Sequence, residues 1–345
     1  MHIKSLSQLT HSTRSWVRSW QNIVSLLFSL GGLLFPANAF AAQPNASLNS
    51  IDKIVRYVDC GRSNKLINSI NGAPASLDPS EDNTIYVRGA CIENVNITGF
   101  DRLTLIAQSG ASISDASGDT AAVVSIDSST RVSVQGFTIN GNGPNAQTEV
   151  IDCTFSYCAF SGNTLQGGSD GVDVFRGARA FFQGDVFQNN NNGAGIFVGQ
   201  NAFVLANGVT LQRNGQGANV AGGFLQINNS TVQNNFGPGI VVRLNGTVNM
   251  IVPTVTGNGG NGISVIGHST LQIGSRIGVI GSSITNNAGA GILVKDLSFA
   301  TFQDGGPIVV KNNLGGTDVL CGPQFPATRG ALTNIGGGST NGIEP

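Results

Sequence analysis

Two carboxylates and two guanidinium groups lie in one short stretch of the chain. Residues 169–179 read Ser-Asp-Gly-Val-Asp-Val-Phe-Arg-Gly-Ala-Arg, which places Asp170, Asp173, Arg176 and Arg179 close together in sequence. Carboxylates bind Ca²⁺, and an arginine can act as a base or neutralise a uronate. These four are therefore candidate catalytic residues for lyase or epimerase chemistry on a uronate polymer, with Asp170 and Asp173 as candidate Ca²⁺ ligands.

The same residues also have a structural interpretation. Asp-Gly is a good turn sequence, and Asp–Arg pairs on exposed strands are ordinary surface charge. No Asp or Glu occurs between Asp185 and Asp296, and His268 is the only histidine after the first 42 residues. Carboxylate chemistry must therefore come from the earlier part of the chain, and catalysis by a histidine pair is excluded.

A repeat determines which elements position these residues. One unit recurs, in which an apolar residue, two spacers and Asn are followed by Gly and an apolar-x-apolar triplet, as in residues 232–242. Its apolar anchors are Leu165, Phe187, Leu211, Val232, Val255, Ile284 and Val310. Strand-like triplets with a period of about 22–24 residues predict an all-β solenoid, a three-sided parallel β-helix with one coil per repeat.

Each position of the repeat has a predicted role. Alternation along a strand should place Ile240 and Val242 in the core, stacked above Ile196 and Val198. The Asn column should lie at a corner, where Asn tolerates left-handed backbone geometry and can bond to Asn in the next coil. Its members are Asn190, Asn214, Asn235, Asn258, Asn287 and Asn313. A polar ligand-binding strip is the alternative interpretation of this column.

The outward positions of the triplets predict a second candidate site, for binding without catalysis. They are Asp173, Phe197, Asn219, Val241, Ser264 and Leu293. Phe197 could stack on a sugar ring. Arg243 and Lys295 share one offset after their coil glycines, so together they could contact an acidic polymer.

The ends of the chain predict four segments. Residues 1–42 combine Lys4, Arg14 and Arg18 with an apolar run over residues 23–35 and small residues near Ala41, as in a secretory signal peptide. A membrane anchor is the alternative, but the run is short for a bilayer span. Residues 43–92 should form an N-terminal cap and first strands, 93–321 the β-helix repeats, and 322–345 a C-terminal cap or tail.

Charge and cysteine content limit which partners and which cellular compartment are expected. The chain has 18 Lys and Arg against 19 Asp and Glu, with no basic cluster of the kind that binds nucleic acid. Five cysteines in an exported chain favour disulfides. Cys60 and Cys91 bracket the segment before the repeats, Cys153 and Cys158 are close enough to bridge locally, and Cys321 is left over. Buried unpaired thiols are the alternative.

Two sets of motifs resemble a known family. Residues 57–61 (Tyr-Val-Asp-Cys-Gly) and 85–95 (Ile-Tyr-Val-Arg-Gly-Ala-Cys-Ile-Glu-Asn-Val), with the Asn-Asn-x-Gly-x-Gly-Ile-x-Val units, resemble bacterial secreted right-handed parallel β-helix repeat proteins of the pectin-lyase-like fold. The resemblance covers roughly residues 55–321. It implies a right-handed parallel β-helix, a fold shared by pectate lyases, polygalacturonases, alginate epimerases and surface proteins of unassigned role, so it does not settle activity.

A narrower resemblance concerns residues 168–174, which are similar to the Asn-Thr-Asp-Gly-x-Asp segment of polygalacturonases. That family has a further acidic pair one coil later, where this chain has Asn-Gly-Ala-Gly-Ile at 192–196. Its Gly-His-Gly motif also has no counterpart nearer than Gly267-His268-Ser269. These departures argue against glycoside hydrolysis by that arrangement.

The function expected from the sequence is that of an exported β-helix repeat protein, secreted or periplasmic, with no membrane span after signal cleavage. It should act as a structural or polysaccharide-interacting module that contacts a polysaccharide or cell-envelope glycan without a cofactor. The alternative is a polysaccharide lyase or epimerase that uses Ca²⁺.

Overall fold

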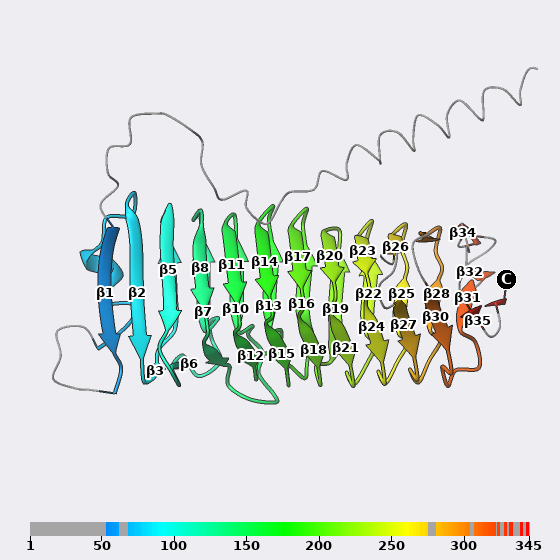
Figure 1. Cartoon of the computed structure of the whole chain (residues 1–345), viewed down its shortest axis with the longest axis horizontal. Helices are drawn as coiled ribbons and strands as arrows, with labels where there is room; N and C mark the ends of the chain where they lie inside the picture. Colours follow the sequence, from blue (N-terminus) through cyan, green and yellow to red (C-terminus); the bar gives the residue numbers. More distant parts are fainter. Residues whose placement is uncertain are drawn as a thin grey trace, which may run out of the picture. The chain divides into compact units, whose positions relative to one another are not determined.

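The apolar-x-apolar triplets form short strands, and three strands make one coil. The computed structural model describes residues 53–61, 68–274, 281–303 and 307–321, and the backbone of short strands between residues 323 and 344. Strands of the same kind in successive coils pair in parallel and form three sheets of 12, 11 and 11 strands. Figure 1 shows these strands stacked side by side along the unit.

The three sheets, here called A, B and C, are visited in the order B, C, A as the chain winds. Sheet A contains β1 (Lys53–Asp59), β2 (Asp82–Arg88), β5 (Arg102–Ala107), β8 (Val132–Gln135), β11 (Tyr157–Ser161), β14 (Arg179–Gln183), β17 (Phe203–Asn207), β20 (Phe224–Asn228), β23 (Thr247–Ile251), β26 (Thr270–Gly274), β29 (Phe299–Phe302) and β34 (Ala331–Thr333). Sheet B contains β3 (Ala90–Ile92), β6 (Ser112–Ser114), β9 (Thr138–Asn140), β12 (Thr164–Gln166), β15 (Val186–Gln188), β18 (Thr210–Gln212), β21 (Thr231–Gln233), β24 (Thr254–Thr256), β27 (Ser282–Thr285), β30 (Ile308–Lys311) and β35 (Ser339–Thr340). Sheet C contains β4 (Val95–Thr98), β7 (Val124–Asp127), β10 (Ile151–Thr154), β13 (Val172–Phe175), β16 (Ala194–Gly199), β19 (Gln216–Ala221), β22 (Ile240–Arg243), β25 (Ile263–Val265), β28 (Ile292–Val294), β31 (Val319–Cys321) and β36 (Ile343–Glu344).

The predicted all-β parallel β-helix is confirmed, and in the described residues the only helix is the 3-10 turn η1 (Pro74–Ser76). Strands β34, β35 and β36 come from the segment predicted to be a C-terminal cap, and each adds to one sheet. A short antiparallel pair, β32 (Pro323–Gln324) and β33 (Thr328–Arg329), precedes them.

The core runs through all the coils because alternate residues of every strand point inward. Ile196, Ile240 and their neighbours in register are fully buried. The predicted stack of Ile240 and Val242 on Ile196 and Val198 is confirmed, with one further coil, carrying Ala218 and Val220, between them. Removing such side chains from water is the main favourable term in folding a solenoid of this kind.

The Asn column forms a continuous buried ladder, here called the asparagine ladder. Each Nδ2 up to Asn287 donates to Oδ1 of the Asn in the next coil, for example Asn235 to Asn258 at 2.8 Å and Asn287 to Asn313 at 2.9 Å. Asn313, the last member, donates to Asp318 Oδ1 at 2.9 Å. Each Oδ1 also accepts from a backbone N–H, and each Nδ2 bonds a backbone carbonyl of the preceding coil. The ladder is therefore structural.

The expected left-handed backbone lies one residue before the ladder. Asn189, Asn234, Asn286 and Asn312 have φ between 54° and 59°, whereas the ladder residues are not among the described residues with positive φ. The correction has a simple cause. The tight turn is completed by the preceding residue, which leaves the ladder Asn free to point inward and bond along the axis.

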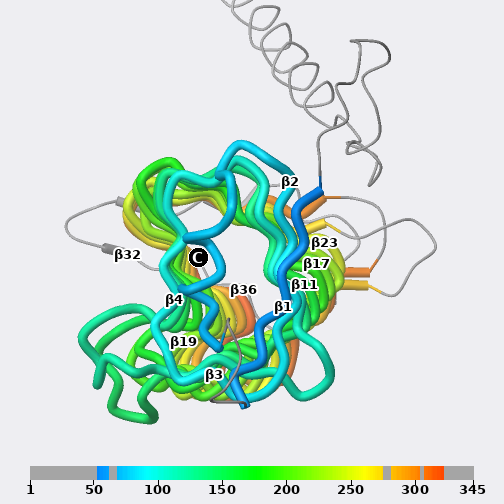
Figure 2. Tube along the Cα trace, turned by 90° about the vertical axis from the view of Figure 1, so that its left-hand side faces the viewer, coloured from blue at the N-terminus to red at the C-terminus, as the bar shows by residue number. Residues whose placement is uncertain are grey.

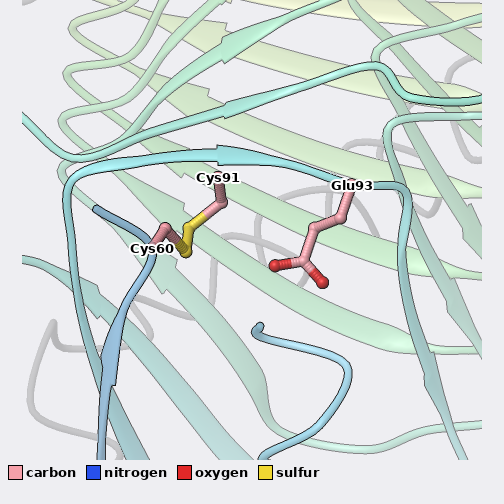
Figure 3. A group of neighbouring side chains, drawn as sticks. All are labelled: Cys60, Cys91 and Glu93. Atoms are coloured by element: carbon pink, nitrogen blue, oxygen red, sulfur yellow. A yellow bond between two sulfur atoms is a disulfide. The ribbon is translucent and has the colours of Figure 1, made fainter. Parts of the chain in front are cut away.

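Both predicted cysteine pairs are disulfides. Cys60 bonds to Cys91 at the start of the stack, and Cys153 bonds to Cys158 between β10 and β11, while Cys321 is free. Figure 3 shows Glu93 beside the first disulfide. The sulfurs are oxidised and so are not thiolate ligands. The Glu93 carboxylate accepts hydrogen bonds from Ser69 Oγ and from the backbone N–H groups of Ile70 and Asn71, which fastens the segment before η1.

Several predictions lie partly or wholly outside the described residues. They are the signal peptide over residues 1–42, most of a helix that the sequence allows around residues 64–71, and most of an insertion loop that the long repeat spacing predicts over residues 274–280. The described residues 68–71 are not helical. Among the residues that the structure describes, no helix is long and apolar enough to cross a membrane.

Candidate functional site

The predicted outward stripe lies along sheet C. Strand register places Asp173 beside Asp152 of β10 on one side and beside Phe197 of β16 on the other. From Phe197 the stripe continues through Asn219, Val241, Ser264 and Leu293. The predicted stripe is therefore confirmed, because each of its residues lies directly beside the next one in the neighbouring strand.

The outward face of sheet C is partly shielded from solvent. Val241 and Ser264 point away from the core, yet they are only 9% and 7% exposed. Their strand neighbours Ile240 and Val242 belong to the core cluster, whereas Val241 does not. A side chain that faces outward and is still nearly buried must be shielded by the flanking turns and its own neighbours, so the face is sheltered from bulk water.

Long connections border this face in the early coils only. The segments from sheet B to sheet C span residues 115–123 and 141–150, whereas the corresponding connection at 213–215 is a tight turn. In Figure 2, which looks along the stack, the cyan and green loops at this corner project beyond the later coils.

Hydrogen bonds hold these two loops in place. The Asp119 carboxylate accepts from the backbone N–H groups of Gln147 and Thr148 and from Thr148 Oγ1, which ties the first loop to the second. These bonds lower the pKa of Asp119. Asn192 Nδ2 then donates to the Ala146 carbonyl oxygen at 2.9 Å and ties the second loop to a later coil.

Asp115 anchors the first loop from within. Burial raises its pKa, but hydrogen bonds from Ser117, Asn94 and the backbone outweigh that effect and bring the pKa to about 2. Asp115 and Asp119 therefore hold the two border loops in place as ionised carboxylates that accept hydrogen bonds.

Four other carboxylates, here called the acid cluster, lie next to this border. They are Glu149, Asp152, Asp170 and Asp173, all partly buried. The pKa of each is raised, in every case chiefly by burial. For Asp173 the charges of Asp170, Glu149 and Asp152 add to burial and raise the pKa to about 8.

Asp170 and Asp173 differ in their partners. Asp170 Oδ1 accepts a hydrogen bond from the Ala194 N–H, and Oδ2 accepts one from Ser169 Oγ at 3.3 Å. Gly193 packs so closely against this carboxylate that a Cβ there would overlap it. Asp173 Oδ1, in contrast, is buried with no hydrogen-bond partner. Asp173 is thus the acid most strongly held in its protonated form at neutral pH.

The two candidate arginines are separated by the structure. Arg176 follows β13 in a left-handed turn with φ of 54°. Its positive charge opposes the rise that burial causes in the pKa of nearby Asp152. Its guanidinium carbon lies 5.0 Å from the ring centre of Phe175 and 5.8 Å from that of Phe155. Arg179 begins β14 and lies on sheet A, so it does not share the face of the acid cluster.

The remaining predicted binding residues lie along sheet C. Phe197 points outward beside Asp173, and its ring lies so close to Gly199 that a Cβ there would touch it. Arg243 ends β22 and donates from Nε to Asn219 Oδ1 at 3.1 Å, so its side chain is engaged within the protein. Lys295 follows β28 two coils further on, at the predicted equivalent position.

Sequence reasoning missed Glu149, Phe155 and Phe175 as members of the site. Glu149 directly precedes the buried residues Val150 and Ile151, which was the available signal that it is drawn toward the sheet. Asp185, placed in the ionic cluster by sequence, is instead buried and accepts from Asn163 N and Nδ2. Burial raises its pKa to about 6.

The acid cluster does not assemble a ready cation cage. Ca²⁺ takes about six to eight oxygen ligands. Among the residues described, no three carboxylates of the cluster bring ligand oxygens within 4.8 Å of one another. The geometry fits shared protons and hydrogen bonds to a ligand better than it fits a preformed metal site.

Comparison with known proteins supports the fold. Residues 121–274 match the family model described as the right-handed beta helix region. No curated protein matches the chain in sequence. This match and the three parallel sheets show that the chain has the fold of a right-handed parallel β-helix.

Solved structures agree at low sequence identity. Geobacillus virus E2 ORF18 matches with a TM-score of 0.56 and 11% identity over 88% of this chain and 62% of its own length. Pectin methylesterase PemA from Erwinia chrysanthemi has a TM-score of 0.42 and 17% identity over 63% and 80%. The catalytic domain of an α-1,3-glucanase has a TM-score of 0.40 and 12% identity over 86% and 70%. At these identities the likeness concerns the fold alone.

Proposed function

We propose that the outward face of sheet C binds a polysaccharide chain and that Asp173 lies at the centre of the binding site. One observation carries the proposal. Asp173 is a partly buried carboxylate whose pKa is raised to about 8 by burial and by three other acids, with Phe197 beside it on the next strand and Phe175 two residues along its own strand. Such perturbed acids concentrate at functional sites.

A sugar chain suits the chemistry of this face. Phe197 and Phe175 offer ring surfaces beside Asp173, and carboxylate oxygens accept hydrogen bonds from hydroxyl groups. Successive coils repeat at about 4.8 Å, so one ligand can extend over several strands. The fixed loop border on one side and the Arg176 turn on the other keep the face shaped before ligand binds.

Acid–base catalysis is the second candidate function, and the different hydrogen-bond partners of Asp170 and Asp173 favour it. Burial raises the pKa of both carboxyl groups. Asp173, with a pKa of about 8, can donate its proton to a glycosidic oxygen. Asp170, whose charged form accepts hydrogen bonds from Ala194 N–H and Ser169, can act as the base once it is ionised. Glycoside hydrolysis requires one protonated and one ionised carboxyl group.

The geometry supports a neutral sugar on sheet C better than a uronate. Four acids surround the position, and Arg176 is the cation beside them, because Arg179 lies on sheet A. A uronate carboxylate would be repelled unless cations were added. A neutral sugar is therefore the favoured ligand of this face.

Export to an oxidising compartment forms part of the proposal. The disulfides Cys60–Cys91 and Cys153–Cys158 are typical of secreted or periplasmic proteins. A polysaccharide outside the cytoplasm is the ligand that such a protein would meet.

The test compares wild type with Asp173→Asn on soluble neutral glucans, methyl-esterified pectin and polygalacturonate, following binding by calorimetry and new reducing ends. Asp173→Asn should lower turnover roughly 100- to 10,000-fold if Asp173 is the acid. Phe197→Ala should weaken binding about tenfold, and circular dichroism should show an unchanged fold.

Asp78→Asn is the matched control, because Asp78 is an exposed carboxylate bonded only to Ser80 in the segment before β2. It should leave binding and turnover as in wild type. Binding that Asp173→Asn weakens, without turnover in wild type, would retain the binding site and remove the catalytic part. Wild-type affinity in both Asp173→Asn and Phe197→Ala would overturn the proposal.

A further inference from the structure

Sheet A carries an outward line of aromatic rings, here called the aromatic stripe. It consists of Tyr157, Phe181, Phe203 and Phe224, from β11, β14, β17 and β20. Their strand neighbours Cys158, Phe182, Val204 and Leu225 are buried in the core, so the stripe residues point away from it. Figure 1 shows these four strands side by side in the middle of sheet A.

The rings form one continuous surface. Ring centres are 5.2 Å apart from Tyr157 to Phe181, 6.4 Å from Phe181 to Phe203, and 5.1 Å from Phe203 to Phe224, the last pair being parallel to within 2°. All four side chains are partly exposed. Four successive coils therefore present aromatic faces of the kind on which sugar rings stack.

Arg179 gives the stripe its charge. Register places it directly between Tyr157 and Phe203, and its side chain is exposed. Its charge opposes the burial that raises the pKa of Tyr157, so the two side chains are close. The four strands that carry the stripe, β11, β14, β17 and β20, contain no Asp or Glu. Among the described residues, Arg179 forms no ion pair.

The stripe is too narrow for a stable contact with another protein. A large aromatic side chain presents about 200 Å², and four partly exposed ones therefore present roughly 300 Å² at most. A stable protein interface needs about 800 Å² from each partner. Polar residues border the stripe, where Asn207 Nδ2 donates to Gln183 Oε1 at 2.8 Å. A narrow apolar strip with a polar edge and one free cation fits a single sugar chain.

We infer that the aromatic stripe and Arg179 form a binding site for an anionic, uronate-containing polysaccharide on sheet A. The apolar faces of successive sugar rings stack on the aromatic side chains, and the Arg179 guanidinium binds a uronate carboxylate. The site is independent of the proposed function, because it lies on a different sheet from the acid cluster. A chain held here would be bound without being cleaved.

The test measures binding of the full protein to polygalacturonate and to the same polymer with methyl-esterified carboxyl groups. Arg179→Gln should weaken binding to polygalacturonate roughly threefold or more at low salt and leave the esterified polymer unaffected. Phe203→Ala should weaken binding to both polymers about tenfold, because both present the same apolar sugar faces.

Phe299→Ala is the matched control. Phe299 is 50% exposed and lies in the same column of sheet A as Phe203, but it belongs to β29, beyond the stripe. It should bind like wild type, and circular dichroism should show all three variants folded. Asp173→Asn should also retain binding to polygalacturonate, which separates this site from the one on sheet C.

Two results would overturn the inference. One is equal affinity of wild type, Arg179→Gln and Phe203→Ala for polygalacturonate, including no binding by any of them. The other is sedimentation of wild type as a dimer that Phe203→Ala converts to a monomer, which would make the stripe a contact between copies of the chain.

Discussion

The asparagine ladder and the acid cluster are both polar groups set against the hydrophobic core, and they differ in how completely they are paired. In the ladder every amide bonds to the next coil and to the backbone, as Asn214 Nδ2 does with Asn235 Oδ1 at 3.2 Å and with the Phe187 carbonyl at 3.0 Å. In the acid cluster Asp173 Oδ1 has no partner, and the pKa values of all four acids are raised.

The difference separates structure from function in one fold. A fully paired buried network stabilises the stack, whereas an unpaired buried carboxylate costs stability and is retained only where it has another use. The early coils also differ from the middle coils in composition and loop length. They carry acids and long loops, whereas the middle coils between Asp185 and Asp296 carry neither an acid nor a comparable described loop before residue 275.

The largest effect is expected from breaking the ladder with Asn235→Ala. This change removes the bonds of Nδ2 to the Leu211 carbonyl and Asn258 Oδ1. It leaves Asn214 N without its acceptor and leaves Asn214 Nδ2 with the Phe187 carbonyl alone. Unfolding in urea should show a loss of about 3–5 kcal/mol. A loss below about 1 kcal/mol would mean that water replaces the side chain and that the ladder is not a buried network.

Asp173→Asn is expected to change the free energy of unfolding in the opposite direction and to stabilise the protein at high pH. The pKa of Asp173 is about 8 in the folded protein, far above that of an unfolded Asp, so the folded state binds the proton more tightly. Wild-type stability should therefore fall as pH rises from about 4 to about 8. The variant should lack the part of this fall that comes from Asp173 and keep the part that comes from the other acids with raised pKa.

At pH 8 the variant should be more stable than wild type by an amount on the order of a few kcal/mol, and the difference should vanish near pH 4. Thermal unfolding at both pH values measures it. A variant that is less stable than wild type at pH 8 would mean that the Asp173 carboxylate has hydrogen-bond partners in the folded protein, as the ladder residues do.

The smallest effect is expected on a second ladder, formed on the outward side of sheet B by Gln166, Gln188, Gln212 and Gln233. Gln212 Nε2 donates to Gln188 Oε1 at 2.9 Å, and Gln212 Oε1 accepts from Gln233. These side chains are partly exposed, so water can replace the lost bonds. Gln212→Ala should cost less than about 1 kcal/mol in urea unfolding, and a cost equal to that of Asn235→Ala would show that burial does not set the difference.

Much of the fold followed from the repeat. The period predicted the coils, the core columns and the outward stripe from Asp173 to Leu293, because in parallel strands each residue lies directly beside its counterpart in the next coil. The Asn column was predicted as structural for the same reason. Its left-handed turn was expected at the ladder residue itself and lies one residue earlier, because a period locates a corner without specifying which residue bends there.

The sequence by itself determined which residues share a column, because columns depend only on the repeat. The tertiary structure decided which columns share a face. Arg176 and Arg179 are three residues apart, yet the turn over residues 176–178 places Arg179 on sheet A. Glu149 joins Asp173 from a different coil through a loop with no repeat. The pKa of Asp173 depends on burial and on neighbours brought together in space, and neither of these is a property of its place in the repeat.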